Sequence, residues 1–226
     1  YPSRSAGIGE PVLEVRELRA NGLKGEIGFQ VRRGEIVGIT GQLGSGTQSL
    51  MESLAGVEHV LGGEVTLYGN AVDLRSRKSG IRAGIAYCSS DRKRNGIFGG
   101  ISIIKNLSSP WLSSVSTAGI VNARAESAKA HENATQFAID VKRMQSSVGT
   151  LSGGNQQKVA VGKWLGIDPA VLLVEEPTRG VDVGARAEIY RQLRALSVSG
   201  VAIVVRSADT NEIFGLCDTI ATYYKG

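Results

Sequence analysis

The sequence predicts an α/β protein with a mainly parallel sheet and a helical insertion in its middle third. Strand-like runs alternate with helical stretches in the last third of the chain, which is the pattern of strand, helix, strand units. A glycine-rich loop joins an apolar strand to a helix-compatible segment from residue 41. At 226 residues, of which 42% are hydrophobic and 21% charged, the chain is long enough to bury a core.

The first part of the chain is read mainly as strands. Short apolar runs bounded by turn residues predict strands at 12–18, 26–31, 35–40, 65–68 and 85–88. A helix-compatible stretch follows the glycine loop at 48–55. This order gives a strand, loop, helix unit in the first quarter of the chain.

The rest of the chain divides into an insertion and a second α/β part. From about 102 to 148 the sequence is rich in Ala, Lys and Glu with helical spacing, which predicts a helical insertion. After it, strand-like runs at 170–174 and 201–205 alternate with helical stretches at 154–165 and 184–196. These later segments complete the predicted parallel sheet.

Composition excludes several classes of protein. No apolar run approaches the roughly 18 residues needed to span a bilayer, and the start lacks a signal pattern. Cys88 and Cys217 lie far apart without a Cys/His cluster, so neither a disulfide framework nor a zinc site is indicated. The net charge of +5 comes from scattered basic residues, which disfavours nucleic acid as a partner. Residues 1–9, rich in Ser, Gly and Pro, suggest a linker remnant and hence a piece of a longer chain.

The glycine-rich loop at 41–48 occupies the frame of the phosphate-binding pattern GxxxxGK[ST]. Its glycines allow backbone N–H groups to cradle phosphate oxygens at a helix N-terminus. Thr47 stands where a lysine would reach the β and γ phosphates, and Gln48 where a hydroxyl would bind magnesium. Alone, the loop could equally be a glycine turn that caps a helix. The candidate nucleotide-binding residues are Gly41, Gly44, Ser45, Gly46, Thr47, Gln48 and Ser49.

A second motif, LSGGNQQK, occupies 151–158 at the start of a predicted helix. Ser152 offers a hydroxyl, Gly153 and Gly154 permit close backbone approach, and the helix N-terminus favours an anion. Without the other motifs, Ser152 would simply be an N-cap.

A third motif, VLLVEEPTRGVD at 171–182, is an apolar strand that ends in Glu175 and Glu176. Ligands bind at the ends of parallel strands, although two acids there could also be merely solvated.

The order of glycine loop, helical insertion, LSGGN and double-acid strand closely resembles the ATP-binding cassette (ABC) ATPases over essentially the whole chain. That family implies a P-loop NTPase (RecA-like) core with an N-terminal antiparallel β subdomain. It assigns about 10–90 and 150–226 to the core and about 91–149 to the helical subdomain. LSGGNQQK, EEPTRGVDVGAR, and IAY at 85–87 with DRKR at 91–94 are similar to the second cassette of ribose, galactose and xylose type importers.

The resemblance also implies roles for single residues. Glu175 takes the place of an aspartate that helps to hold Mg²⁺, and Glu176 the place of the general base. Ser90 stands at the Q-loop position and Ala208 at the switch-histidine position, so both depart from an active cassette. Since Thr47 and Gln48 depart too, we expect weak or absent ATP and Mg²⁺ binding and negligible hydrolysis by this half.

In this family two cassettes meet head to tail, so each ATP lies between one phosphate loop and the other signature. Ser152, Gly153, Gly154 and Asn155 would then serve the ATP of the partner cassette, with Asp182 of the D-loop at the same interface. The implied partners are the first nucleotide-binding domain, transmembrane permease subunits and, indirectly, a periplasmic sugar-binding protein. The implied location is the cytoplasmic face of the bacterial inner membrane.

Two alternatives remain open at this stage. The chain could be a nucleotide-free structural half that only docks on the permease, or a nucleic-acid or ribosome-associated ABC ATPase. The absence of a basic linker and of a long coiled-coil insertion argues against the second. The apolar residues Ile101, Ile103, Ile104, Leu107 and Trp111 could either contact the membrane subunits or form a subdomain core.

Overall fold

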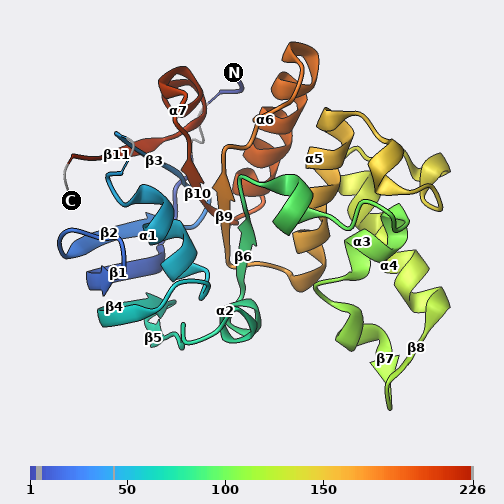
Figure 1. Ribbon diagram of the computed structural model, residues 1–226, viewed down its shortest axis with the longest axis horizontal. Helices are drawn as coiled ribbons and strands as arrows, with labels where there is room; N and C mark the ends of the chain where they lie inside the picture. Colours follow the sequence, from blue (N-terminus) through green and yellow to red (C-terminus); the bar gives the residue numbers. More distant parts are fainter. Residues whose placement is uncertain (4–6, 43, 225–226) are drawn as a thin grey trace. The chain divides into compact units, whose positions relative to one another are not determined.

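The computed structural model describes residues 1–3, 7–42 and 44–224 of the chain (Figure 1). Two compact units are present. The first comprises Tyr1–Tyr87, Ala170–Pro177 and Tyr190–Gly226, and the second comprises Cys88–Pro169 and Thr178–Ile189. The sequence-based boundaries near 91 and 149 concern functional subdomains and stay a prediction. The expected linker at 1–9 falls partly on residues 4–6, which lie outside the description, as do 225–226 at the chain end.

The first unit holds a five-stranded sheet of order β11-β3-β10-β9-β6. β10 pairs parallel with β3 and β9, and β11 pairs parallel with β3, so the predicted mainly parallel sheet is confirmed. All of β9 is buried, as expected for a strand covered on both faces. The strands are β3 (Ile36–Gly41), β6 (Ile85–Cys88), β9 (Val171–Glu175), β10 (Ala202–Arg206) and β11 (Thr219–Tyr223).

An antiparallel sheet of order β2-β1-β4-β5 forms the expected N-terminal β subdomain. Its strands are β1 (Pro11–Ala20), β2 (Ile27–Arg32), β4 (Val60–Leu67) and β5 (Asn70–Ala71). β4 begins five residues earlier than predicted (60 against 65), because Gly62 and Gly63 weaken the strand signal in the sequence. The unit also contains α1 (Thr47–Leu54), α2 (Arg77–Ala83) and α7 (Thr210–Leu216). Leu50, Met51 and Leu54 of α1 are fully buried in the core that both sheets share.

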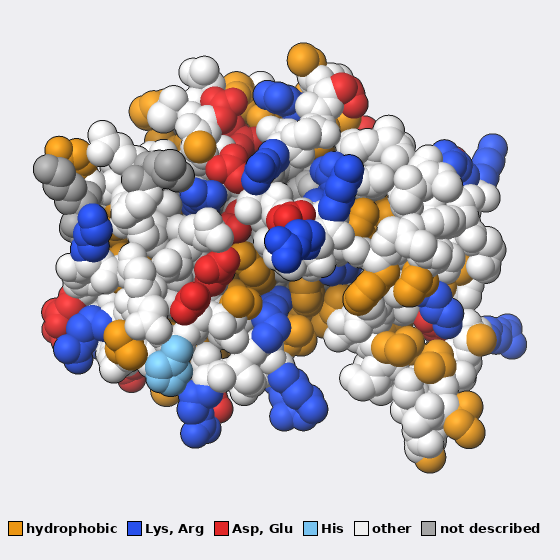
Figure 2. Space-filling model, viewed as in Figure 1, with side chains coloured by type: hydrophobic (Ala, Val, Ile, Leu, Met, Phe, Trp, Pro, Cys, Tyr) orange, Lys and Arg blue, Asp and Glu red, His pale blue; other side chains and the backbone are white. Residues whose placement is uncertain are grey.

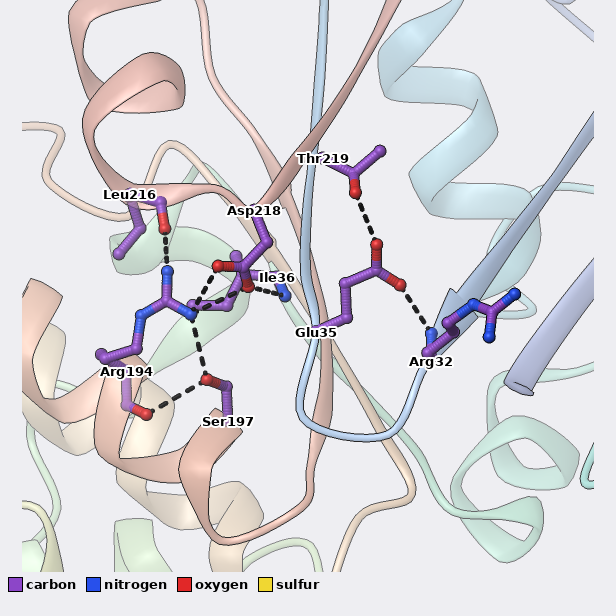
Figure 3. A network of polar contacts seen from close by, with 8 residues as sticks. All are labelled: Arg32, Glu35, Ile36, Arg194, Ser197, Leu216, Asp218 and Thr219. Atoms are coloured by element: carbon purple, nitrogen blue, oxygen red, sulfur yellow. Dashed lines mark hydrogen bonds and ion pairs between the residues drawn. The ribbon is translucent and has the colours of Figure 1, made fainter. Parts of the chain in front are cut away.

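A buried ion pair ties the last helix-and-strand elements of the first unit together (Figure 3). Arg194 lies on α6 (Val183–Val198), whose residues divide between the units after position 189. Its guanidinium donates to Asp218 at 2.8 Å and to the carbonyl of Leu216. Asp218 in turn accepts from the backbone N–H of Ile36 at 2.8 Å, at the start of β3. The pair therefore joins α6 to the segment before β11 and to β3.

The second unit is mainly helical. Its α-helices are α3 (Ile103–Ser108), α4 (Ala123–Gln136), α5 (Gly153–Gly162) and the first turns of α6. A π-helical turn at Arg92–Gly96 precedes them, and 3₁₀ turns lie at Leu112–Val115, Val141–Arg143, Val148–Thr150 and Lys163–Ile167. Among the described residues, no helix is both long and apolar enough to cross a membrane.

The predicted helical insertion at 102–148 is mainly helical, but it also contains a short hairpin. A hairpin of β7 (Ser116–Thr117) and β8 (Ile120–Val121) separates α3 from α4. Its two-residue loop, Ala118 and Gly119, has φ values of 49° and 81°. Two positive φ values in a two-residue loop are typical of the type I′ turns that match the twist of a hairpin. This local turn overrides the helical composition on both sides.

The apolar residues that left two readings open fall mostly in the core of the second unit. Ile103, Ile104, Leu107 and Trp111 are buried, whereas Ile101 is 45% exposed. On the face shown in Figure 2, Lys and Arg side chains are dispersed and interleaved with Asp and Glu. This distribution agrees with the scattered basic residues of the sequence.

Candidate functional site

The glycine loop of the first unit runs from the end of β3 at Gly41 to the start of α1 at Thr47. Gly46 is the N-cap of α1 and lies in the left-handed region, with φ 89°, and Gly44 has φ 81°. No described side chain caps this helix, so its first N–H groups face the loop. An uncapped helix N-terminus behind a glycine loop favours the binding of an anion.

Close packing explains why the outer loop positions need glycine. A Cβ at Gly41 would lie 2.6 Å from both the Ser45 hydroxyl and the Tyr223 carbonyl, and one at Gly46 would lie 2.7 Å from the Gly22 carbonyl. Gly44, by contrast, faces open space. The loop is therefore closely packed at Gly41 and Gly46, and a ligand could approach its backbone at Gly44.

The polar side chains of the loop have separate fates. Ser45 is buried, and its hydroxyl has no hydrogen-bond partner among the described residues. Thr47, at the expected lysine position, is buried, and its hydroxyl accepts from Arg206 Nε at 3.4 Å. Gln48 is exposed and donates to Glu52 at 3.0 Å, while Ser49 is half-buried. No cation therefore comes from the described loop itself.

Both predicted acids lie at the carboxyl end of β9, in the same unit as the loop. Glu175 is buried, and its Oε2 accepts from the Tyr87 hydroxyl at 3.2 Å. Glu176 has a left-handed backbone, with φ 46°. Its Oε1 accepts from Arg206 Nη1 at 3.2 Å and from the backbone N–H of Ala208 at 3.0 Å. Its Oε2 accepts from the Ser207 hydroxyl at 3.3 Å.

The segment 206–208 is thus part of this site. Ala208, expected as a degenerate switch position, reaches Glu176 through its backbone N–H. Arg206 and Ser207 were missed as site residues. A signal was present in the sequence, because Arg206 is the one charged residue in the otherwise apolar run AIVVR.

The donor set fits phosphate better than magnesium. The loop supplies backbone N–H groups and the hydroxyl of Ser45, which has no hydrogen-bond partner among the described residues. Strand β10 supplies the guanidinium of Arg206. Magnesium needs a near-octahedral set of oxygen ligands. Gln48 brings an amide that already binds Glu52, and Glu175 is buried against Tyr87. Within the described ranges, no cluster of three or more His, Cys, Asp or Glu could hold a metal.

The second unit contains the other predicted motif. Ser152 is the exposed N-cap of α5, and its hydroxyl accepts from the Asn155 N–H at 3.5 Å. A Cβ at Gly153 would lie 2.5 Å from the Gly180 carbonyl, and one at Gly154 would lie 2.5 Å from the Ala185 Cβ. Packing inside this unit therefore already requires both glycines.

Ser90 and Asp182 are the remaining predicted residues of the second unit. Ser90 is half-buried before the π-helical turn, where Arg92 donates to Gln157 at 3.0 Å. Asp182 is exposed and caps α6 by accepting from the Ala185 N–H at 3.0 Å. Their expected roles stay predictions.

A parallel sheet, a glycine loop that joins β3 to a helix and two acids at the end of β9, one strand further along the sheet, define a P-loop nucleotide-binding domain. A family model described as ABC transporter matches residues 25–179. The chain belongs to the ABC transporter family, as its motifs predicted.

Several curated relatives share a single description. The chain is 38% identical to "Ribose import ATP-binding protein RbsA 2" of Rhizobium meliloti (strain 1021), over 100% of this chain and 44% of that protein. It is 42% identical to a protein of the same name from Rhizobium etli, over 99% of this chain and 44% of that protein. With "Ribose import ATP-binding protein RbsA" of Bacillus subtilis (strain 168) the identity is 36%, over 100% and 46%. The chain therefore spans less than half the length of these relatives.

Solved structures confirm the fold. A nucleotide-free ATP-binding cassette from an ABC transporter superposes with a TM-score of 0.83 at 16% identity, over 96% of this chain and 88% of that one. The dimeric bacterial ABC transporter cassette MJ0796 gives a TM-score of 0.77 at 18% identity, over 95% of each chain. The α/β fold of an ABC ATPase cassette is thereby established.

Proposed function

We propose that this chain is a nucleotide-binding domain of a monosaccharide importer whose own phosphate loop does not support hydrolysis, and whose signature segment serves the ATP of a partner domain. The ribose import names of its relatives support the importer class. The state of Glu176, whose carboxylate is held by three donors of the segment 206–208, carries the proposal about hydrolysis.

A general base must accept a proton from a positioned water. In this chain, Glu176 accepts from Arg206, Ser207 and Ala208, and the carboxylate is 16% exposed. These donors take three of the about four acceptor positions of the carboxylate, which leaves little room for a water to donate to it. The missing magnesium donors described above act in the same direction, because hydrolysis of a triphosphate depends on metal as well as base.

The signature segment keeps what a partner's nucleotide would use. Ser152 presents an exposed hydroxyl at the N-terminus of α5, a ten-residue helix whose dipole favours an anion. Asp182 is exposed and Asn155 is half-buried, and both belong to the same unit as Ser152. In the head-to-tail arrangement of the family, this face would complete the ATP site of the first nucleotide-binding domain.

The proposed partners and location concern the whole importer. We propose permease subunits as membrane partners, a periplasmic sugar-binding protein as an indirect partner, and the cytoplasmic face of the inner membrane as the location. In such an assembly the energy comes from ATP and Mg²⁺ at the competent site.

The test is the ATPase rate of the assembled importer that contains this chain. Ser152→Arg is expected to lower the rate by roughly tenfold or more, because it blocks the anion face of α5. Glu176→Gln in this chain is expected to leave the rate within about twofold, since no step depends on that carboxylate. Ser113→Arg, a change at an exposed serine of the same unit, is the control. A large loss in Glu176→Gln with no loss in Ser152→Arg would reverse the assignment.

A further inference from the structure

We propose that Arg206 binds the nucleotide phosphates at this glycine loop, in place of the lysine that the loop lacks. The inference deepens the proposed function and rests on it for the identity of the ligand. It concerns how a loop with Thr47 at the lysine position still attracts a triphosphate.

The position of Arg206 in the sheet brings its side chain to the loop. Arg206 is the last residue of β10, in register with Ile39 of β3 on one side and with Glu175 of β9 on the other. The four preceding residues of β10 are buried and apolar. Arg206 is therefore the first side chain of the central strand that leaves the core, at the strand end where parallel sheets bind ligands.

The contacts of Arg206 place its guanidinium between the loop and the acid. Nε donates to the Thr47 hydroxyl at 3.4 Å, and Nη1 donates to Glu176 at 3.2 Å. The side chain is 17% exposed, so it is sheltered but still reachable. The residue that replaces the loop lysine is thus itself in contact with a cation from a different strand.

The guanidinium has donors to spare. Arginine carries five N–H donors in a planar fork that suits phosphate oxygens. The hydrogen bonds between Arg206 and other described residues use two of its nitrogens, Nε and Nη1. A phosphate oxygen could be bound by the remaining donors while the ion pair with Glu176 stays intact.

Charge gives a second reason. Glu175 and Glu176 lie next to each other at the strand end, and two carboxylates there repel an anionic ligand. Arg206 is paired with Glu176 and offsets one of these charges. Loss of Arg206 would remove the attraction between its guanidinium and the phosphates, and it would leave the charge of Glu176 unpaired. Loss of the Glu176 charge would only reduce the repulsion between the carboxylates and the phosphates.

This difference separates a phosphate-binding role from a merely structural one. Arg206→Gln and Glu176→Gln break the same ion pair from opposite sides. If the pair only stabilises the fold, both substitutions should affect ATP binding in the same direction. If Arg206 binds phosphate, they should differ, because one removes a cation and the other an anion.

The experiment is a calorimetric titration of the chain with ATP, and separately with inorganic tripolyphosphate, in EDTA so that no metal contributes. Arg206→Gln is expected to weaken binding of both by roughly 10- to 100-fold, the loss of one or two charge-assisted bonds. Glu176→Gln is expected to bind at least as tightly as the natural chain. Thr47→Lys is expected to restore binding when added to Arg206→Gln. Circular dichroism of each variant shows that it is folded.

Equal weakening by Arg206→Gln and Glu176→Gln, unchanged binding by Arg206→Gln, or no binding by the natural chain would each overturn the role of Arg206. None of these results bears on the signature segment, which the Ser152→Arg ATPase assay tests independently. Failure of that assay with an Arg206-dependent titration would instead refute the proposed function and leave the phosphate contact standing.

Discussion

Replacing Arg194 by alanine should strongly destabilise the first unit. The side chains of Arg194 and Asp218 are 6% and 5% exposed, and their closest N and O atoms are 2.8 Å apart. Removing one member of such a pair leaves a buried charge without its partner, which costs about 3–5 kcal/mol. The Leu216 carbonyl would also lose the guanidinium as a donor.

The magnitude can be converted into a melting temperature. For a chain of this size, each kcal/mol lowers Tm by about 2–4 °C, so the expected drop is roughly 6–20 °C. Circular dichroism at 222 nm during thermal and urea unfolding measures it. Trp111 and Trp164 both lie in the second unit and would report on that unit instead.

Arg191→Ala is the matched control, because Arg191 lies on the same helix and is exposed. It should change the unfolding free energy by less than about 0.5 kcal/mol. A double substitution with Asp218→Ala should recover part of the loss, since neither charge is then buried alone. A loss below about 1 kcal/mol for Arg194→Ala, or one equal to that of Arg191→Ala, would refute the reasoning.

Three further outcomes are expected. Gly46→Ala should cost about 1–3 kcal/mol in urea unfolding, because alanine is strained at φ 89° and its Cβ would meet the Gly22 carbonyl. Ala118→Gly should stabilise the hairpin turn by about 0.5–1 kcal/mol in the same assay, since glycine tolerates its φ of 49°. Burial raises the pKa of Tyr223 to about 12, which absorbance at 295 nm in the natural chain and Tyr223→Phe can measure. Because the folded pKa is the higher one, this stabilising contribution is complete below pH 10 and is lost as pH rises through 12.

The strands of the parallel sheet could be predicted because buried strands are continuous apolar runs in the sequence. β9 is an example: VLLVE is buried throughout and ends at the acids. The hairpin at 116–121 could not be predicted, since Ala118 carries no turn signal by itself and adopts positive φ only in the folded context. The composition of this segment favours a helix, but the turn at Ala118 and Gly119 forms a hairpin instead.

The candidate site was predicted as far as its motifs are contiguous. Glu176 and the glycine loop could be predicted as candidates because each lies in a short recognisable run. Arg206 was missed because its contact with Thr47 joins residues 159 positions apart. An arginine at the end of a strand normally ends in solvent, so only the register of β10 beside β3 and β9 shows that it reaches the loop.

The packing of the signature glycines affects how related sequences should be compared. Gly153 and Gly154 are closed to larger side chains by Gly180 and Ala185 of the same unit. A cassette that had lost every nucleotide contact would still need glycine at these two positions in order to fold. Ser152 is exposed and holds only a long cap bond, so drift could replace it at little cost. When degenerate cassettes are compared, a retained serine at this position therefore indicates a retained nucleotide contact. A retained pair of glycines does not, because folding alone requires it.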